Sequence, residues 1–354
     1  MRFKILGTSS LVLAGLTALA LAAEKPALAA DSLTIVSWGG AYQTSQREAF
    51  FKPFAKETGV QITEEEYTGE LAKVRAQVET GTISWNVVDL TTRSALAACA
   101  EGLIEPIDWA KLGLDPANFI GGDLQECGVP NIVYSTVLAY DADRLKEGPT
   151  KIEDIFDLEK FPGKRSLQKD PFGNLEWALI ADGVPAADIY KVLATEEGID
   201  RAFKKLDTIK SQVVWWEAGA QPPQLLADGE VVMASGWNGR FYDAVKNEGK
   251  NFVIVWDRQV LDWDWWAIPK GSDKVDLAYQ FIAFASRADT MADQTNYITY
   301  GPANMDSESK ISSEIMAQLP TSAENMTTAI APDIQFWADN ADQLTQRFTA
   351  WLAQ

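Results

Sequence analysis

Histidine does not occur anywhere in this sequence, and cysteine occurs only twice, at Cys99 and Cys127. Without histidine the chain cannot build a Ser-His-Asp or Cys-His catalytic arrangement, an imidazole metal site or a histidine proton relay. Two cysteines well separated in the sequence also exclude a thiolate metal cluster. An enzyme made from this chain would therefore depend on carboxylates, lysine or tyrosine, and we expect neither a metal nor a cofactor.

The sequence also lacks long hydrophobic runs, and its one notable apolar stretch is short and lies near the start. Arg2 and Lys4 precede an apolar stretch at 11–21, and Ala27-Leu28-Ala29 offers a cleavage site, a pattern typical of a secretory signal peptide. We predict that residues 1–29 are cleaved and that the protein is periplasmic and not membrane-embedded, because no later segment reaches the ~18–20 apolar residues of a membrane span. In an oxidising compartment an even cysteine count favours a Cys99–Cys127 disulfide, with two buried thiols as the alternative.

Positive charge is scarce relative to negative charge. The chain has 31 Lys and Arg against 50 Asp and Glu, a formal net charge of −19 at pH 7. This field repels nucleic acid and anionic membrane surfaces and mildly favours cationic solutes, so no nucleic-acid partner is expected.

Apolar strand-like segments alternate with helical patterns in the first third of the chain. We expect strands at 33–38, 61–67 and 85–90, and helices at 43–58, 71–79 and 94–101. This alternation predicts parallel βαβ units, in which ligands bind beyond the carboxyl ends of the strands. Trp38, after the first strand, and the Thr91–Arg93 loop, after the third, are therefore candidate site positions.

A second α/β pattern follows a β-prone run at 131–140. It combines helices at 175–182, 199–209 and 240–246 with strands at 212–216, 231–235 and 252–256, and further helices are expected at 275–286 and 332–352. Two α/β lobes connected by extended crossings favour a hinged, closing architecture.

The segment Asp262-Trp263-Asp264-Trp265-Trp266 alternates acids with indole rings. On a strand, Asp262, Asp264 and Trp266 share one face, and Trp263 and Trp265 share the other. A carboxylate beside an aromatic face suits an organic ammonium group, because charge and cation–π attraction add. The alternative is a buried tryptophan cluster whose acids face solvent.

Five stretches, in the same order, carry a resemblance to a known family: 37–42 (SWGGAY), 101–107 (EGLIEPI), 237–240 (WNGR), 266–271 (WAIPKG) and 300–304 (YGPAN). They are similar to the spermidine/putrescine-binding branch of the periplasmic solute-binding proteins of ABC transporters. The resemblance implies an α/β, two-lobed periplasmic binding protein fold of type II, in which each lobe is a mixed sheet flanked by helices and crossing strands form a hinge. It implies an N-terminal lobe of 30–140 plus 264–306, a C-terminal lobe of 141–263 plus 307–354, a monomer, and delivery of ligand to a membrane permease.

The same resemblance implies residues that contact the ligand, but this chain departs from the family at charged positions. The family's second-lobe acidic pair is missing near Lys169 and Gly173, while Arg93, Arg240 and Asp262 are additional charges. Tyr42 also stands one residue further from Trp38 than in polyamine binders. The resulting candidate set is Trp38, Tyr42, Thr91, Arg93, Trp237, Arg240, Asp262, Asp264, Trp266 and Tyr300.

These departures favour a short zwitterion such as γ-aminobutyrate, with its ammonium at Asp262 and Asp264 and its carboxylate at Arg93 and Arg240. Putrescine or spermidine remains open if the arginines pair with protein acids: Arg240 with Asp243 or a neighbouring acid, and Arg93 in a surface or inter-lobe ion pair. A sugar stacked on tryptophan faces is a further candidate ligand, and an exported glycoside hydrolase is the candidate enzyme. The hydrolase is disfavoured because acids two residues apart on one strand do not flank a bond from opposite sides. We therefore predict a binding protein and not an enzyme.

Overall fold

The computed structural model describes residues 31–121 and 126–354, so the predicted signal peptide lies outside the described residues. No helix within these two ranges has the length and apolar character needed to cross a bilayer. The strands are β1 (Ser32–Ser37), β2 (Gln61–Glu66), β3 (Val87–Thr91), β4 (Val129–Asp141), β5 (Arg165–Gln168), β6 (Val213–Trp216), β7 (Met233–Trp237), β8 (Phe252–Ala267) and β9 (Gly301–Pro302).

The helices before β7 are α1 (Gly40–Gln46), α2 (Lys52–Thr58), α3 (Leu71–Thr80), α4 (Thr92–Ala100), α5 (Trp109–Leu112), α6 (Asn174–Ala181), α7 (Ile189–Leu193), α8 (Glu196–Asp207) and α9 (Gln221–Asp228). Those after β7 are α10 (Asn238–Glu248), α11 (Val275–Ala285), α12 (Ala288–Gln294), α13 (Ser313–Met316) and α14 (Ile334–Leu352). A π-helical turn, Arg47–Phe51, joins α1 to α2, so the helix predicted over 43–58 is continuous but not uniform.

The strands form one mixed sheet in the order β2-β1-β3-β8-β4-β7-β5-β6, with β9 paired to β4. β1 is parallel to β2 and β3, and β5 is parallel to β6 and β7. The parallel βαβ units predicted in the first third of the chain are therefore confirmed, and the second α/β pattern also contains parallel pairs. β8 runs antiparallel to β3 and β4, and β4 runs antiparallel to β7, so β8 and β4 together connect the two parallel groups.

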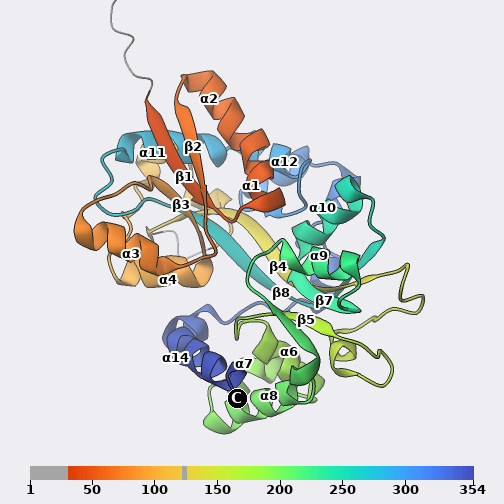
Figure 1. Ribbon diagram of the computed structural model, residues 1–354. Helices are drawn as coiled ribbons and strands as arrows, with labels where there is room; N and C mark the ends of the chain where they lie inside the picture. Colours follow the sequence, from red (N-terminus) through yellow and green to blue (C-terminus); the bar gives the residue numbers. More distant parts are fainter. Residues whose placement is uncertain (1–30, 122–125) are drawn as a thin grey trace, which may run out of the picture. The chain divides into compact units, whose positions relative to one another are not determined.

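β4 and β8 are the longest strands and lie side by side through the middle of the sheet (Figure 1). The sequence predicted a strand at 252–256 and a separate later segment, but β8 is continuous from Phe252 to Ala267. The pairing of β4 with β8 shifts register between Thr136 and Leu138, opposite the stretch that contains Arg258, whose φ is +54°. A bulge absorbs the extra residues on β8, so one strand serves both halves of the sheet.

The hydrophobic core consists of several separate clusters of buried side chains. The largest cluster packs α6, α8 and α14 against residues such as Leu138 and Val255, and Figure 1 shows these helices grouped at one end of β4 and β8. Other clusters pack α2 and α11 against one face of β1 and β3, and α3 and α4 against the opposite face. A small aromatic cluster around Tyr134 is separate from these clusters and surrounds the site described below.

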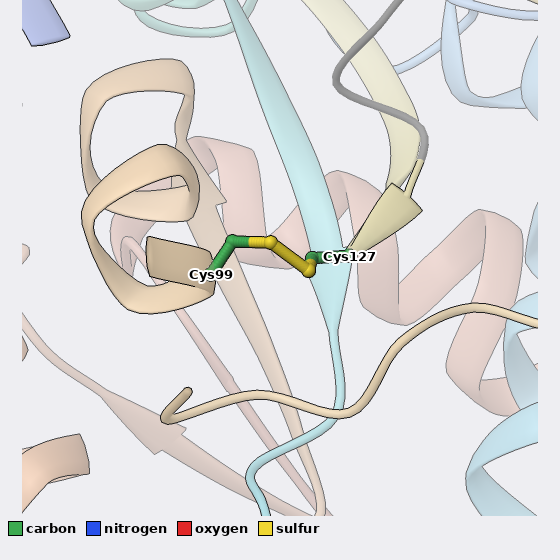
Figure 2. Close-up of a disulfide and its surroundings, with 2 residues drawn as sticks. All are labelled: Cys99 and Cys127. Atoms are coloured by element: carbon green, nitrogen blue, oxygen red, sulfur yellow. A yellow bond between two sulfur atoms is a disulfide. The ribbon is translucent and has the colours of Figure 1, made fainter. Parts of the chain in front are cut away.

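The predicted disulfide is confirmed. Cys99, in the last turn of α4, is bonded to Cys127, two residues before β4, with a Cα–Cα distance of 5.7 Å (Figure 2). The bond ties α4 to the strand that runs through the centre of the sheet.

Candidate ligand-binding site

A small, partly open cavity lies where β1, β3, β4, β7 and β8 approach one another. The side chains that line it leave a free volume of only about 10 Å³; they are Trp38, Tyr42, Thr91, Ile132, Tyr134, Trp237, Asp264 and Tyr300. Six of these eight residues belong to the candidate set drawn from the sequence. A free volume of about 10 Å³ is roughly the space that one water molecule needs, so the walls must move apart to admit a ligand.

Aromatic rings form most of the cavity wall and meet edge to face. Trp38 packs against Trp237 at 5.8 Å between ring centroids, and Tyr42 packs against Tyr300 at 5.3 Å. Tyr134 contacts both Trp237, at 5.9 Å, and Tyr300, at 6.2 Å. In each pair the edge of one ring meets the face of the other, and ring faces that are not covered in this way can contact an apolar or cationic ligand.

The junction between β7 and α10 holds two of these rings in place. Asn238, the first residue of α10, accepts a hydrogen bond from the Ser135 backbone N–H at 3.0 Å and donates one to the Thr299 carbonyl at 2.6 Å. Trp237 and Tyr300, the residues next to this double contact, are thereby fixed relative to β4. Gly239 lies so close that an added Cβ would stand 2.6 Å from Tyr300 Cε1.

Asp264 is the carboxylate of the cavity wall. It pairs with Thr91 across the β3–β8 ladder and is buried, and its Oδ1 has no hydrogen-bond partner among the described residues. Burial, together with the negative charge of Asp89, raises the pKa of the Asp264 carboxyl well above its ordinary value. An unpartnered buried acid on a ring-lined wall is suited to bind a cation.

The second acid of this segment has a different position. Asp262 does not line the cavity; it accepts hydrogen bonds from the Tyr134 hydroxyl at 3.0 Å and from the Trp263 backbone N–H at 2.8 Å. Burial raises the pKa of Asp262, and the Arg93 charge opposes that rise. Asp262 therefore supports Tyr134 from behind the wall.

Trp266 is not at the cavity, contrary to the sequence prediction. Its ring packs on Phe50 and Phe281, with centroid distances of 6.2 and 5.5 Å, in the core under α2 and α11. The alternation argument placed it correctly on the face of Asp264, but the strand continues two residues beyond the cavity, where this face is covered by helices.

Arg240 lies beside the cavity and not in its wall. Its guanidinium donates to the Gly39 carbonyl at 2.8 Å and to the Trp38 carbonyl at 3.0 Å, and its charge acts on Asp264 and Tyr300. The alternative that pairs Arg240 with Asp243 is wrong, because the guanidinium bonds these two carbonyls instead; contact with a ligand carboxylate stays a prediction. Arg240 forms no ion pair with any described residue, and its Nε is buried without a partner.

Arg93 does not line the cavity either, although the sequence placed it among the ligand contacts. Both its terminal nitrogens bond Asp170, at 3.2 and 3.1 Å, and its Cζ lies 4.7 Å from the Phe172 ring centroid and 5.5 Å from that of Trp337. The second interpretation, an ion pair, describes Arg93 correctly. Its positive charge is already matched by a carboxylate.

Sequence reasoning missed two residues of the wall and one acid behind it. Ile132 and Tyr134 lie in β4, a continuous apolar run in which nothing distinguishes a residue facing a cavity from one facing the core. Asp89 was detectable in principle, because it is a carboxylate inside the apolar run Val87-Val88-Asp89-Leu90. It is fully buried and accepts a hydrogen bond from the Tyr42 hydroxyl at 2.8 Å.

Residues 49–325 match the family described as bacterial extracellular solute-binding protein. The γ-aminobutyric acid-binding protein of Pseudomonas aeruginosa is 46% identical over 324 residues, which cover 92% of this chain and 92% of that protein. The chain therefore belongs to the family of bacterial extracellular solute-binding proteins.

Solved structures agree with this assignment. A periplasmic binding protein, MotA of A. tumefaciens B6, solved in complex with glucopine, has a TM-score of 0.85 and 34% identity, over 91% of this chain and 99% of that one. A GABA receptor has a TM-score of 0.80 and 34% identity, over 92% of this chain and 98% of that one. The fold is thus the two-lobed α/β fold of type II periplasmic binding proteins, as the sequence predicted.

Proposed function

We propose that this protein captures a short zwitterion of the γ-aminobutyrate type, holding its ammonium at Asp264 and its carboxylate at Arg240. The observation that carries the proposal is the presence of two buried, oppositely charged groups with an unpartnered atom each: Asp264 in the cavity wall and Arg240 beside it, whose Oδ1 and Nε have no partner among the described residues. A ligand with an ammonium at one end and a carboxylate at the other matches both charges, and the 46% identical relative is named for γ-aminobutyric acid.

The size and wall of the cavity support a short ligand. Because the free volume is only about 10 Å³, a short ligand needs less separation of the walls than a polyamine that carries amines along its length. The Trp38 indole N–H is buried without a partner in the described residues and lines the same cavity, so it supplies a second donor for a carboxylate. The wall rings cover the methylene chain between the two charged ends.

The lobes of the proposed closing mechanism are 30–140 plus 264–306 and 141–263 plus 307–354. Separate core clusters on the two sides of the long strands support this division. The register shift between Thr136 and Leu138 supports a hinge in β4 and β8, because irregular pairing lowers the cost of bending there. Arg93–Asp170 and Arg240 with the Trp38 and Gly39 carbonyls would then close across the two lobes.

The proposed setting is the periplasm, after cleavage of a signal peptide, with delivery of the ligand to an ABC-transporter permease by a monomer that performs no catalysis. The relatives with similar length are binding proteins, and the disulfide fits an oxidising compartment. Binding would select the closed arrangement, and the closed form would be the one presented to the permease.

The test is calorimetry on protein stripped of ligand by unfolding and refolding, titrated with γ-aminobutyrate, putrescine and spermidine. Only γ-aminobutyrate is expected to bind tightly. Arg240→Met should weaken that binding by roughly 30-fold or more, because the ligand carboxylate loses its buried partner. Arg75→Met, which breaks the exposed pair of Arg75 with Glu101, is the matched control and should leave affinity unchanged.

Titration of Arg240→Met with the diamine putrescine distinguishes two possible roles of this arginine. A structural role for Arg240 predicts that every ligand binds worse, whereas contact with the carboxylate predicts a selective loss of γ-aminobutyrate. Tight putrescine binding by the unmodified protein, unaffected by Arg240→Met, would replace the zwitterion with a diamine. No heat with any of the three ligands would remove this ligand class.

A further inference from the structure

Asp89 is a buried acid that ligand contact alone does not explain. Its Oδ2 accepts hydrogen bonds from Ser37 Oγ at 3.1 Å, from the Tyr42 hydroxyl at 2.8 Å and from Gln46 Nε2 at 2.6 Å. Its Oδ1 is buried and has no partner among the described residues. One oxygen of this carboxyl is therefore saturated, and the other is unmatched.

Asp264 lies close by on the neighbouring strand. The β3–β8 register pairs Asp89 with Trp266 and Thr91 with Asp264, so the two acids are one diagonal step apart on the same face. The Tyr42 hydroxyl contacts both carboxyls. Because it donates its proton to Asp89 and accepts from Asn131 Nδ2 at 2.9 Å, it has no proton left for Asp264.

The other groups around the pair do not supply a compensating cation in contact with it. Arg240 bonds the backbone carbonyls of Trp38 and Gly39, and Arg93 bonds Asp170. The remaining polar and titratable groups that face the pair from the packed elements are neutral donors or further acids: Ser37, Gln46, Tyr67, Asn131, Tyr134, Asp262 and Tyr300. Two adjacent carboxylates in a dry site cannot both be ionised without a cation.

We propose that Asp89 and Asp264 form a carboxyl pair that holds one proton while the cavity is empty and releases it to solvent when the ligand's ammonium enters. This rests on the proposed function, in which an ammonium meets Asp264. On release one carboxyl O–H bond breaks and the pair gains one negative charge, which the ammonium balances. Burial raises the pKa of Asp89 to about 7, which agrees with a proton held near neutral pH.

Calorimetry in buffers of different ionisation enthalpy counts the protons exchanged. With γ-aminobutyrate at pH 7 we expect a release of roughly half to one proton per ligand, and an affinity that rises up to about tenfold per pH unit between pH 5 and 7. Binding without proton release, at an affinity independent of pH, would overturn the proposal while leaving the proposed function standing.

Asp89→Asn is the direct variant, because its amide oxygen can keep the three hydrogen bonds to Oδ2 while its NH₂ replaces the unmatched Oδ1. It should still bind γ-aminobutyrate, with proton release and pH dependence largely lost. Glu101→Gln removes one negative charge at an exposed position paired with Arg75 and should retain both. Equal proton release in Asp89→Asn and the unmodified protein would contradict the pairing.

A measurement without ligand separates this proposal from the ligand assignment. The infrared difference spectrum between pH 5 and pH 9 of the stripped protein should contain a protonated-carboxyl band that is lost in Asp89→Asn. Absence of that difference refutes the shared proton even if no tested ligand binds. Its presence upholds the pair even if the ligand is not γ-aminobutyrate.

Discussion

Asp262 and Asp264 are chemically identical and stand two residues apart on β8, but their surroundings give them different roles. Asp262 is bonded by the Tyr134 hydroxyl and by a backbone N–H, whereas Asp264 faces the cavity with an unpartnered oxygen. A cation entering the cavity therefore meets Asp264 first. The Asp262 carboxylate lies behind the wall and acts through the position of Tyr134 and through its charge on Asp264.

Exchanging each acid for its amide should separate the two roles. Asp264→Asn is expected to weaken γ-aminobutyrate binding by about 100-fold or more, because removing one partner of a buried charge pair costs about 2–5 kcal/mol. Asp262→Asn retains an oxygen that can accept from Tyr134 and should cost less than about tenfold. Calorimetry at one fixed pH measures both, and equal losses would show that both acids hold the ligand directly.

At the scale of elements, the Arg93–Asp170 pair joins α4 to the loop after β5. The two side chains are 20% and 25% exposed, and the guanidinium also covers Phe172. Because none of these residues lines the cavity, we expect the pair to act on ligand affinity through closure alone. Its strength should lie between that of exposed and buried ion pairs.

Arg93→Met and Asp170→Asn should each weaken ligand binding by about 5- to 30-fold, which corresponds to about 1–2 kcal/mol. The loss should show mainly as faster ligand dissociation, since the closed state is less stable while the cavity is intact. A double variant should lose little more than either single one. If Arg93→Met behaves like Arg75→Met, which affects only an exposed pair, the contact does not stabilise closure.

The Cys99–Cys127 disulfide connects α4 to the start of β4, across 28 residues of sequence. In the chain-entropy account, closing such a loop stabilises the fold by about 3–4 kcal/mol. The Cys99→Ser/Cys127→Ser double variant should therefore unfold at a clearly lower urea concentration, with ligand affinity nearly unchanged. Urea titration with and without reductant measures this, and an unaltered midpoint would assign the bond no stabilising role.

Most elements could be predicted from the sequence because their patterns are local. The βαβ alternation around Trp38 and Thr91 identified two strand ends that do meet at the cavity. Contacts that depend on tertiary pairing could not be predicted: Arg93 with Asp170 joins positions 77 residues apart, and Arg240 with the Gly39 carbonyl joins positions 201 apart. Nothing local marks either arginine as bonded to protein or to ligand.

At the scale of the whole molecule, two arginine contacts and one ring-lined cavity lie between the proposed lobes. If these contacts hold the lobes together only when the ligand compensates Asp264 and Arg240, the stripped protein should be more open. Small-angle scattering should show a smaller radius of gyration after addition of γ-aminobutyrate, and Asp264→Asn should remove that change. An equally compact stripped protein would show that closure precedes binding.

The pH dependence of stability is also a property of the whole chain. Four buried carboxyls, Asp89, Glu176, Asp262 and Asp264, have pKa values raised mainly by burial. The acids whose pKa is lowered, Glu70, Glu101 and Glu105, are mostly exposed and lose their contributions only as the pH falls below the ordinary carboxyl range. Between pH 5 and pH 8 the buried acids therefore decide the trend.

Each raised pKa means that the folded protein binds that proton more tightly than the unfolded chain, whose carboxyls titrate near ~4. The resulting stability is complete below that pH and is lost as pH rises through the folded-state value, which is about 7 for Asp89. Ligand-free protein should therefore melt about 3 °C or more higher at pH 5.5 than at pH 8, from a slope of up to about 1.4 kcal/mol per pH unit for each group.

Asp89→Asn should flatten this dependence, and saturating γ-aminobutyrate should raise the melting temperature most at pH 8. A loss of net negative charge would raise stability at low pH in both proteins alike, so an equal slope in Asp89→Asn would assign the effect to the whole surface and not to the buried pair.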